Sequence, residues 1–249
     1  SSFSEVVEAG VLAQTRIGYK DWLYATVGVR NDANSAFGAD FTTITYPRMN
    51  VSYIPTNQLG QLGPVSTARL RFAWGQAGQQ PGAFDQFTTY LPWASEFGPG
   101  VSPGNVGNPA LKPEISTEIE MGGEVGLLND KLAFDFQYWS RDVKDALIQK
   151  QYPQSGGFYR TQVSNIGSLE ASGWEIGVDA SLIRNSSYTV DLYGSISYLE
   201  EKILELNAPE QKVGGSYPRY RNFLAEGWAP GTYFGAKGSW EVDSNIKYP

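Results

Sequence analysis

The chain has 249 residues, a formal net charge of −7 at pH 7 and an aromatic content of 14%. That aromatic content excludes collagen-like and disordered chains, and the acidic balance argues against a nucleic-acid binder, which would carry a basic patch. Because the sequence contains no Cys and no His, it excludes disulfides, thiolate zinc sites and Ser-His-Asp catalysis, and we expect neither a cofactor nor a metal site.

The first pattern in the chain is an alternation of apolar and polar residues, which runs from Val11 to Tyr19 and again from Trp22 to Arg30. The break between the two runs consists of Lys20 and Asp21 and predicts a hairpin with a tight turn. No apolar run in the chain is long enough for a transmembrane helix, but a β-strand crosses a bilayer with ~9–11 residues. Alternating runs of this length are therefore candidate membrane strands.

Six further strands follow in chain order. The first two, near 48–54 and 68–75, flank a linker at 55–66. The other four form two hairpins around short turns: 117–127 with 132–141 around Asn129-Asp130, and 174–182 with 188–198 around Asn185-Ser186. The sequence therefore predicts about eight strands in a single antiparallel succession.

The connections between these strands alternate in length. Short breaks at 20–21, 129–130 and 185–186, together with the linker 55–66, alternate with long segments at 31–47, 77–113, 149–170 and 200–230. Short turns at one end and long loops at the other are typical of outer-membrane barrels. We therefore predict an all-β fold, an antiparallel transmembrane β-barrel segment of about eight strands from a larger barrel, with long extracellular loops and short periplasmic turns.

The alternation also predicts which side chains face lipid. If the register shifted by one residue, every acidic side chain would point into the hydrocarbon core of the membrane. We expect lipid contact for Leu23, Val27, Phe134, Phe136, Ile176, Val178, Val190 and Leu192. We expect inward-pointing side chains at Glu120, Glu124, Asp135, Gln137, Glu175 and Asp179. The longest apolar faces end in aromatic residues, as an interfacial girdle requires: Tyr19, Tyr138, Trp174, Tyr188 and Tyr198.

A soluble β-sandwich with one wet face per sheet is the alternative, because its strands show the same alternation. Sandwich strands average ~5–6 residues, however, and the runs in this chain keep their pattern for longer. Several Gly residues also fall on the polar faces, among them Gly18, Gly28, Gly122, Gly126 and Gly177. Because glycine weakens a strand, its presence on these faces needs a reason. A curved barrel wall that faces a crowded lumen supplies one.

Several stretches together resemble one known family, the TonB-dependent outer-membrane transporters of the SusC/RagA type. They are YPR at 46–48, LRFAWGQAG at 70–78, NPALKPE at 108–114, NIG at 165–167, GWEI at 173–176 and EGWAPGTYFG at 226–235. Each motif alone is weak, but they keep the order of the family and span nearly the whole chain. The resemblance implies that residues 1–249 are a partial barrel, with the plug domain and the remaining strands outside this chain.

The resemblance also implies a function and partners. Such transporters lie in the lipid of the outer membrane, capture glycans or peptides with a SusD-like lipoprotein lid, and draw energy from TonB, which here would act through a region outside this chain. We therefore expect import and no catalysis. The sequence leaves the cargo open, and it leaves open two alternative functions: a carbohydrate-binding module, or a barrel that serves as a structural component of a surface assembly.

Five charged residues are candidates for the lumen-facing wall. Glu118, Glu120 and Glu124 share the polar face of one strand, and Asp135 and Arg141 lie on its partner. These residues either contact substrate or form a solvated charge network against the plug. We favour the network, because charged faces are usually structural.

Aromatic residues in two long segments are candidates for ligand binding. Tyr90, Trp93 and Phe97 lie in 77–113, and Tyr152, Phe158 and Tyr159 lie in 149–170. Exposed aromatic rings stack on sugars or grip a peptide. The alternative is that these rings pack loop against loop or against a partner lid.

Overall fold

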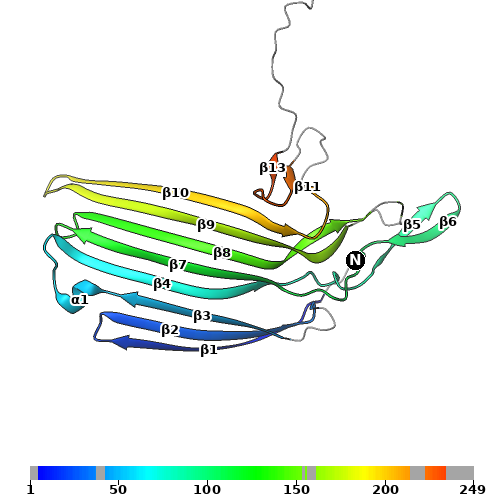
Figure 1. Cartoon of the computed structure of the whole chain (residues 1–249), viewed down its shortest axis with the longest axis horizontal. Coiled ribbons are helices and arrows are strands. Elements are labelled where there is room, and N and C mark those ends of the chain that lie inside the picture. Colours follow the sequence, from blue (N-terminus) through cyan, green and yellow to red (C-terminus); the bar gives the residue numbers. More distant parts are fainter. Residues whose placement is uncertain (1–4, 38–42, 153–154, 156–160, 214–221, 234–249) are drawn as a thin grey trace, which may run out of the picture.

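The computed structural model describes residues 5–37, 43–152, 155, 161–213 and 222–233. Eight strands form one antiparallel sheet in the order β1-β2-β3-β4-β7-β8-β9-β10 (Figure 1). Their bounds are β1 Glu8–Tyr19, β2 Leu23–Asn34, β3 Ile44–Tyr53, β4 Val65–Gln79, β7 Glu114–Leu127, β8 Leu132–Gln151, β9 Thr161–Arg184 and β10 Thr189–Leu206. The predicted succession of eight antiparallel strands is therefore confirmed.

The remaining elements lie outside this sheet. Helix α1, Pro55–Leu59, occupies the predicted linker, and β5, Tyr90–Ser95, pairs with β6, Gly98–Pro103, as a separate hairpin. A small sheet contains β11 Gln211–Val213, β12 Asn222–Leu224 and β13 Thr232–Tyr233. The described residues include no helix that is long and apolar enough to cross a membrane.

The connections sort to two ends of the sheet, as predicted. The turns after β1, β7 and β9 and helix α1 lie at one end, on the left of Figure 1, which we call the turn end. The β5–β6 hairpin lies at the other, which we call the loop end. Lys20 and Asp21 have φ of 47° and 54°, and Asn129 and Asp130 have φ of 59° and 58°. Asp and Asn tolerate this left-handed region better than most residues, so these pairs close the tight turns.

The pairing register gives the sheet two chemically different faces. Residues directly opposite each other on neighbouring strands share a face. One row of such neighbours crosses the whole sheet: Tyr19, Leu23, Tyr53, Leu70, Gly123, Phe136, Ile176 and Ile196. We call this the apolar face and the other the polar face. The predicted division holds, since Phe136 and Ile176 belong to the apolar face whereas Gln137 and Glu175 pair on the polar face.

Aromatic residues bound the apolar face at both ends. The apolar positions run from Tyr188, just before β10, to Tyr198 within it, and Glu200 and Lys202 follow. Ten residues of strand measure ~33 Å, which at a tilt of ~35–45° spans ~25 Å, the height of a barrel's lipid band. The Tyr198 ring stacks on Trp174, with the centroids 6.0 Å apart. The apolar face therefore has the height and the aromatic edge that a bilayer requires.

The long loops are shorter than the sequence predicts, because several strands continue beyond the apolar band. Strand β9 begins at Thr161 and β10 ends at Leu206, so the predicted loops 149–170 and 200–230 are partly strand. In these extensions Asp142 pairs with Glu170, and Glu170 with Lys202, on the same face as the apolar band. Because polar residues occupy both faces of these extensions, the sequence shows no alternation there, although the backbone hydrogen bonds between the strands continue.

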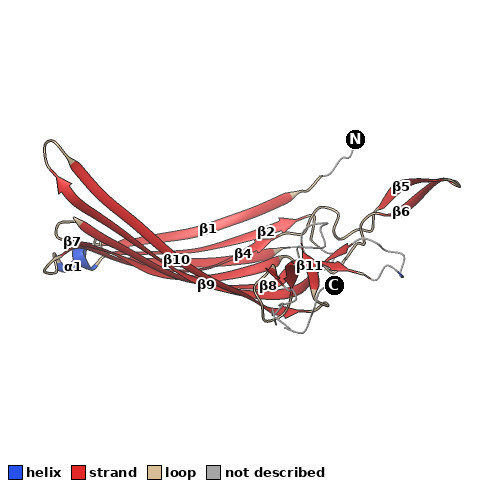
Figure 2. Cartoon of the chain, turned by 90° about the horizontal axis from the view of Figure 1, so that it is seen from above, coloured by secondary structure: helices blue, strands red, loops and turns tan. Residues whose placement is uncertain are grey.

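The β-sandwich alternative is wrong for the part of the chain that the structure describes. The eight strands form one curved layer (Figure 2), and the other two sheets have only three and two strands. A sandwich would bury Phe136, whereas 47% of Phe136 is exposed. The buried apolar cluster lies instead near the loop end, where Phe37, Ile44 and Tyr46 pack together.

Candidate functional site

The five charged residues predicted to face the lumen come together on the polar face. In the register of β7 and β8, Glu118 is opposite Arg141 and Glu124 is opposite Asp135. Glu120 lies between the two glutamates on β7, with the same facing. The structure therefore brings all five side chains to the side of the sheet that the apolar band does not occupy.

Ion pairs connect four of these residues. The Nε atom of Arg141 lies 2.5 Å from Oε2 of Glu118. Arg71 lies between two acids, with Nη1 at 2.8 Å from Oε1 of Glu124 and Nη2 at 2.6 Å from Oδ2 of Asp135. Since these side chains remain between a quarter and a half exposed, each pair contributes only about 0–1 kcal/mol to stability. The network therefore orients the charged groups more than it stabilises the sheet.

Arg71 and its neighbour Arg69 are the members of this network that sequence reasoning missed. Arg69 lies on the same strand as Arg71, and its Nη1 atom is 3.9 Å from Oε2 of Glu124. Both arginines lie on β4, which pairs directly with β7. Their alternation around Leu70 was a usable signal, because it placed two cations on the polar face of the strand next to the acids.

Two glycines on the polar face make room for one long side chain, which gives a physical reason for Gly28 among the glycines that the sequence singles out. A Cβ atom at Gly28 would lie 3.1 Å from Nε of Arg48, and one at Gly75 would lie 3.3 Å from Cβ of Arg48. These two glycines flank Arg48 in the register. Arg48 can therefore lie across β2, where its Nη2 donates a hydrogen bond of 2.6 Å to Oε1 of Gln14.

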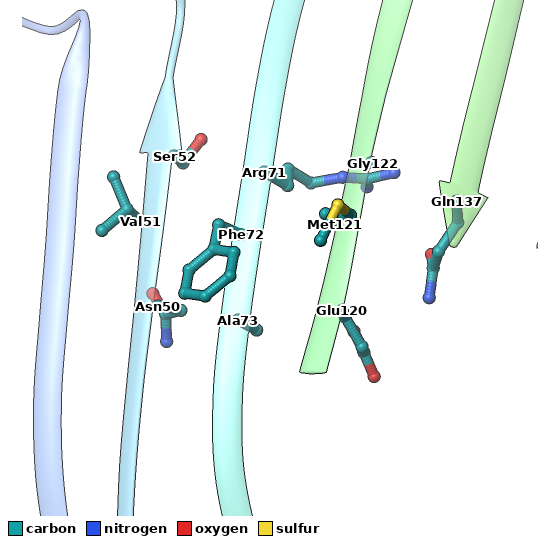
Figure 3. A pocket seen from close by; sticks show the side chains of 10 residues that line it. All are labelled: Asn50, Val51, Ser52, Arg71, Phe72, Ala73, Glu120, Met121, Gly122 and Gln137. Atoms are coloured by element: carbon teal, nitrogen blue, oxygen red, sulfur yellow. The ribbon is translucent and has the colours of Figure 1, made fainter. Parts of the chain in front are cut away.

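A hollow of about 240 Å³ lies over the middle of β3, β4 and β7 (Figure 3). On the polar face its lining includes Asn50, Ser52, Arg71, Glu120 and Gln137. In Figure 3 the side chain of Arg71 extends from β4 across to β7. A second hollow of about 460 Å³ shares Asn50 and Glu120 with the first. The polar face thus offers amide, carboxylate and guanidinium groups, which bind polar ligands by hydrogen bonds.

The three aromatic residues of the β5–β6 hairpin do not form one platform. Tyr90 and Trp93 are 64% and 59% exposed. They stand an odd number of positions apart on β5, opposite Pro103 and Gly100 of β6, so their side chains leave opposite faces of the hairpin. Phe97 lies in the turn between β5 and β6 and is fully exposed. The hairpin therefore presents aromatic rings on both faces and at its tip.

Tyr152 is anchored at the loop end. Its hydroxyl donates a hydrogen bond of 2.6 Å to Oε1 of Gln162, and Gln162 Nε2 donates one of 2.7 Å to the Gly107 carbonyl. These contacts fit the alternative that this ring packs loop against loop. Phe158 and Tyr159 lie outside the described residues.

The described residues hold no group of three or more His, Cys, Asp or Glu side chains that could bind a metal ion. Three acids on β7 and β8, Glu118, Glu124 and Asp135, form ion pairs with arginines instead. What this arrangement offers chemically is a charged, hydrogen-bonding wall.

The comparison with known families identifies the family to which this chain belongs. Residues 2–248 match the family described as "TonB dependent receptor-like, beta-barrel". The chain belongs to this family. TonB-dependent receptors of this kind are outer-membrane proteins, so the apolar band of the sheet faces the lipid of the outer membrane.

Individual relatives agree with the family. The TonB-dependent receptor SusC of Bacteroides thetaiotaomicron is 29% identical over 194 residues, which cover 73% of this chain and 19% of SusC. A TonB-dependent receptor of Formosa agariphila is 28% identical over 228 residues, covering 89% of this chain and 21% of that protein. The chain therefore spans about a fifth of the length of these curated relatives. They are named as receptors and not as enzymes.

Solved structures share the fold. The RagAB peptide transporter superposes with a TM-score of 0.81 at 22% identity, covering 92% of this chain and 25% of that chain. The siderophore receptor PirA from Pseudomonas aeruginosa superposes with a TM-score of 0.53 at 20% identity, covering 80% of this chain and 37% of that chain. The eight-stranded sheet is thus part of a SusC/RagA-type barrel.

Proposed function

We propose that the full-length protein containing this chain is an outer-membrane importer of the SusC/RagA type, which takes up glycans or peptides in a TonB-dependent manner. The observation that carries the proposal is the pair of faces on one continuous sheet. Eight strands combine an apolar band ~25 Å high with a charged opposite face. A wall of this kind separates lipid from a polar lumen, and the family membership supports the proposal that this lumen is a transport path.

The proposed partners follow from the relatives. The RagAB structure is named as a peptide transporter, and SusC is named as a TonB-dependent receptor. We infer that a SusD-like lipoprotein lid closes the loop end of the sheet, and that TonB acts through a region outside this chain. Both the exposed rings of the β5–β6 hairpin and the charged wall suit contact with cargo or lid. This function is transport and involves no catalysis.

Uptake by the intact cell tests the proposed function. A strain that lacks the full-length gene is compared with wild type for uptake of labelled oligosaccharides and labelled oligopeptides, with and without a protonophore. We expect the deletion to abolish uptake of one cargo class, and the protonophore to abolish it in wild type. Unchanged uptake of both classes in the deletion strain would instead support a structural role in a surface assembly.

The proposed sidedness has its own test. This chain contains no Cys, so single cysteines can be introduced at Glu96, in the tip between β5 and β6, and at Asn129, in the turn after β7. In the full-length protein, a membrane-impermeant maleimide should label Glu96→Cys on intact cells and Asn129→Cys only after lysis. The unsubstituted protein is the control, and labelling of Asn129→Cys on intact cells would contradict the orientation.

A further inference from the structure

The turn between β1 and β2 sends its two charged residues to opposite faces of the sheet. The Nζ atom of Lys20 lies 5.3 Å from the ring centroid of Tyr19, and Tyr19 belongs to the apolar face. The next residue, Asp21, accepts a hydrogen bond of 3.4 Å from the Tyr24 hydroxyl, and Tyr24 is opposite Ser52 on the polar face. The cation of this turn therefore lies on the lipid side, and the acid lies on the lumen side.

Three aromatic rings meet on the lipid side of this turn. The Trp22 ring lies between those of Tyr19 and Tyr53, with centroid distances of 5.3 and 5.7 Å and interplanar angles of 83° and 80°. We call Tyr19, Lys20, Trp22 and Tyr53 the lysine corner. It lies at the turn end of the apolar face, on β1 to β3. Because Trp and Tyr rings favour the level of the lipid headgroups, the lysine corner is where this face meets the headgroup region.

Helix α1 and the residue before it hold the lysine corner in place. The Ile54 amide donates a hydrogen bond of 2.7 Å to the Trp22 carbonyl. The Tyr53 hydroxyl donates one of 2.6 Å to Oε1 of Gln58 in the helix. A site that is fixed before its ligand arrives loses less conformational entropy on binding. The lysine corner is therefore preorganised for a ligand.

Lys20 differs from the other cations beside the tight turns. Among the described residues, no carboxylate lies within ion-pair distance of Lys20. Lys131 instead accepts a hydrogen bond at its carbonyl from the Ser181 amide, and Ser181 is opposite Asp191 on the polar face. Arg184 has its Nη2 atom 3.7 Å from Oδ1 of the same Asp191. Lys20 is thus a cation on the lipid side whose three N–H donors are available to a ligand.

We propose that the lysine corner binds an anionic phospholipid, with the Lys20 ammonium against the headgroup phosphate and the three rings against the glycerol and the upper acyl chains. Lysine binds phosphate as a point charge, and a basic residue at a membrane surface attracts anionic lipid. A zwitterionic headgroup carries its own cation, so Lys20 favours the anionic one. The proposed sidedness makes this a lipid of the periplasmic leaflet, but the binding itself rests only on the facing of the sheet.

The test uses the full-length protein in lipid vesicles, with brominated phosphatidylglycerol as the anionic probe and brominated phosphatidylcholine as the zwitterionic one. Bromine quenches a tryptophan that it contacts, and subtracting the signal of the same protein with Trp22→Phe isolates Trp22. We expect about fivefold preference for phosphatidylglycerol, the effect of one lysine near a charged surface. Lys20→Gln should abolish this preference, and Lys20→Arg should keep it. Lys131→Gln is the matched control, because it removes the same charge at the turn end but on the polar face.

Each variant is first shown to be folded by its heat-modifiable mobility. Equal quenching of Trp22 by the two probes in the wild type would overturn the proposal, although the lysine corner would still face lipid. An equal loss of preference in Lys20→Gln and Lys131→Gln would assign the attraction to the charge of the whole turn end, and would overturn it too. If neither probe quenches Trp22, the facing of β1 to β3 is also wrong. Because both leaflets of the vesicle hold the same lipids, these results depend neither on the sidedness nor on the cargo.

Discussion

The facing of β8 can be tested by placing the same charge on its two sides. Phe136 lies on the apolar face between Gly123 and Ile176, near the middle of the apolar run that begins at Leu132. Arginine at the lipid-facing midplane of a barrel costs ~2–4 kcal/mol. Because 1.4 kcal/mol corresponds to a factor of ten, Phe136→Arg should lower the folding equilibrium constant by about 30- to 700-fold. Its chain neighbour Gln137 faces Glu175 on the polar face, so Gln137→Arg should cost less than about 0.5 kcal/mol.

Both variants are made in the full-length protein. The amount of heat-modifiable, folded barrel in the outer-membrane fraction is measured for each, and urea titration in lipid vesicles gives the free energy of unfolding. We expect Phe136→Arg to lose most of the folded protein and Gln137→Arg to match wild type. Equal assembly of the two variants, or a larger loss for Gln137→Arg, would refute the assignment of the apolar face to lipid.

Three other substitutions, one of them with a matched control variant, test the wall and the hairpin in the full-length protein. Arg71→Ala removes the cation between Glu124 and Asp135 and should lower the free energy of unfolding by about 1 kcal/mol in low salt and by less in 1 M NaCl; an equal loss in both would contradict an electrostatic cause. Gly122→Ala places a Cβ atom 2.6 Å from the Phe136 carbonyl oxygen and should cost ~1–3 kcal/mol, whereas Gly194→Ala meets no atom within 4 Å and should leave the urea midpoint unchanged. Trp93→Ala should also leave the midpoint unchanged, because the side chain is 59% exposed, but it should reduce cargo uptake; unchanged uptake would contradict a role of this ring in cargo or lid contact.

The sequence predicts the membrane-embedded part of the fold well, because lipid and lumen impose opposite demands on alternate residues. Phe134 and Phe136 had to face one way and Asp135 the other, and the register agrees. Beyond the apolar band, water contacts both faces of the sheet, so alternate residues no longer need to be apolar and polar. Glu170 therefore fell within the predicted loop 149–170, although it pairs with Asp142 and Lys202 within the sheet.

The charged site could be predicted only in part, for a related reason. Alternation shows which face an acid occupies, but ion pairing depends on which strands are neighbours. Arg71 and Asp135 are far apart in sequence and meet because β4 pairs with β7 across the whole β5–β6 insertion.

Two of the motifs that carry the family resemblance contact each other in the folded chain. The Asn165 side chain of the NIG segment bonds to both backbone groups of Lys112 in the NPALKPE segment: its Oδ1 accepts from the amide at 2.9 Å and its Nδ2 donates to the carbonyl at 2.8 Å. Asn108, at the start of NPALKPE, donates to the Val163 carbonyl at 3.2 Å, and Leu111 within it is buried to 1% exposure.

These contacts join the long segment before β7 to the extension of β9 above the apolar band. An asparagine that bonds to both backbone groups of one residue fixes the chain more firmly than either bond alone. The β5–β6 hairpin emerges from the segment that ends in this clamp. These two motifs therefore have a structural role, because they tie the segment that follows the β5–β6 hairpin to strand β9.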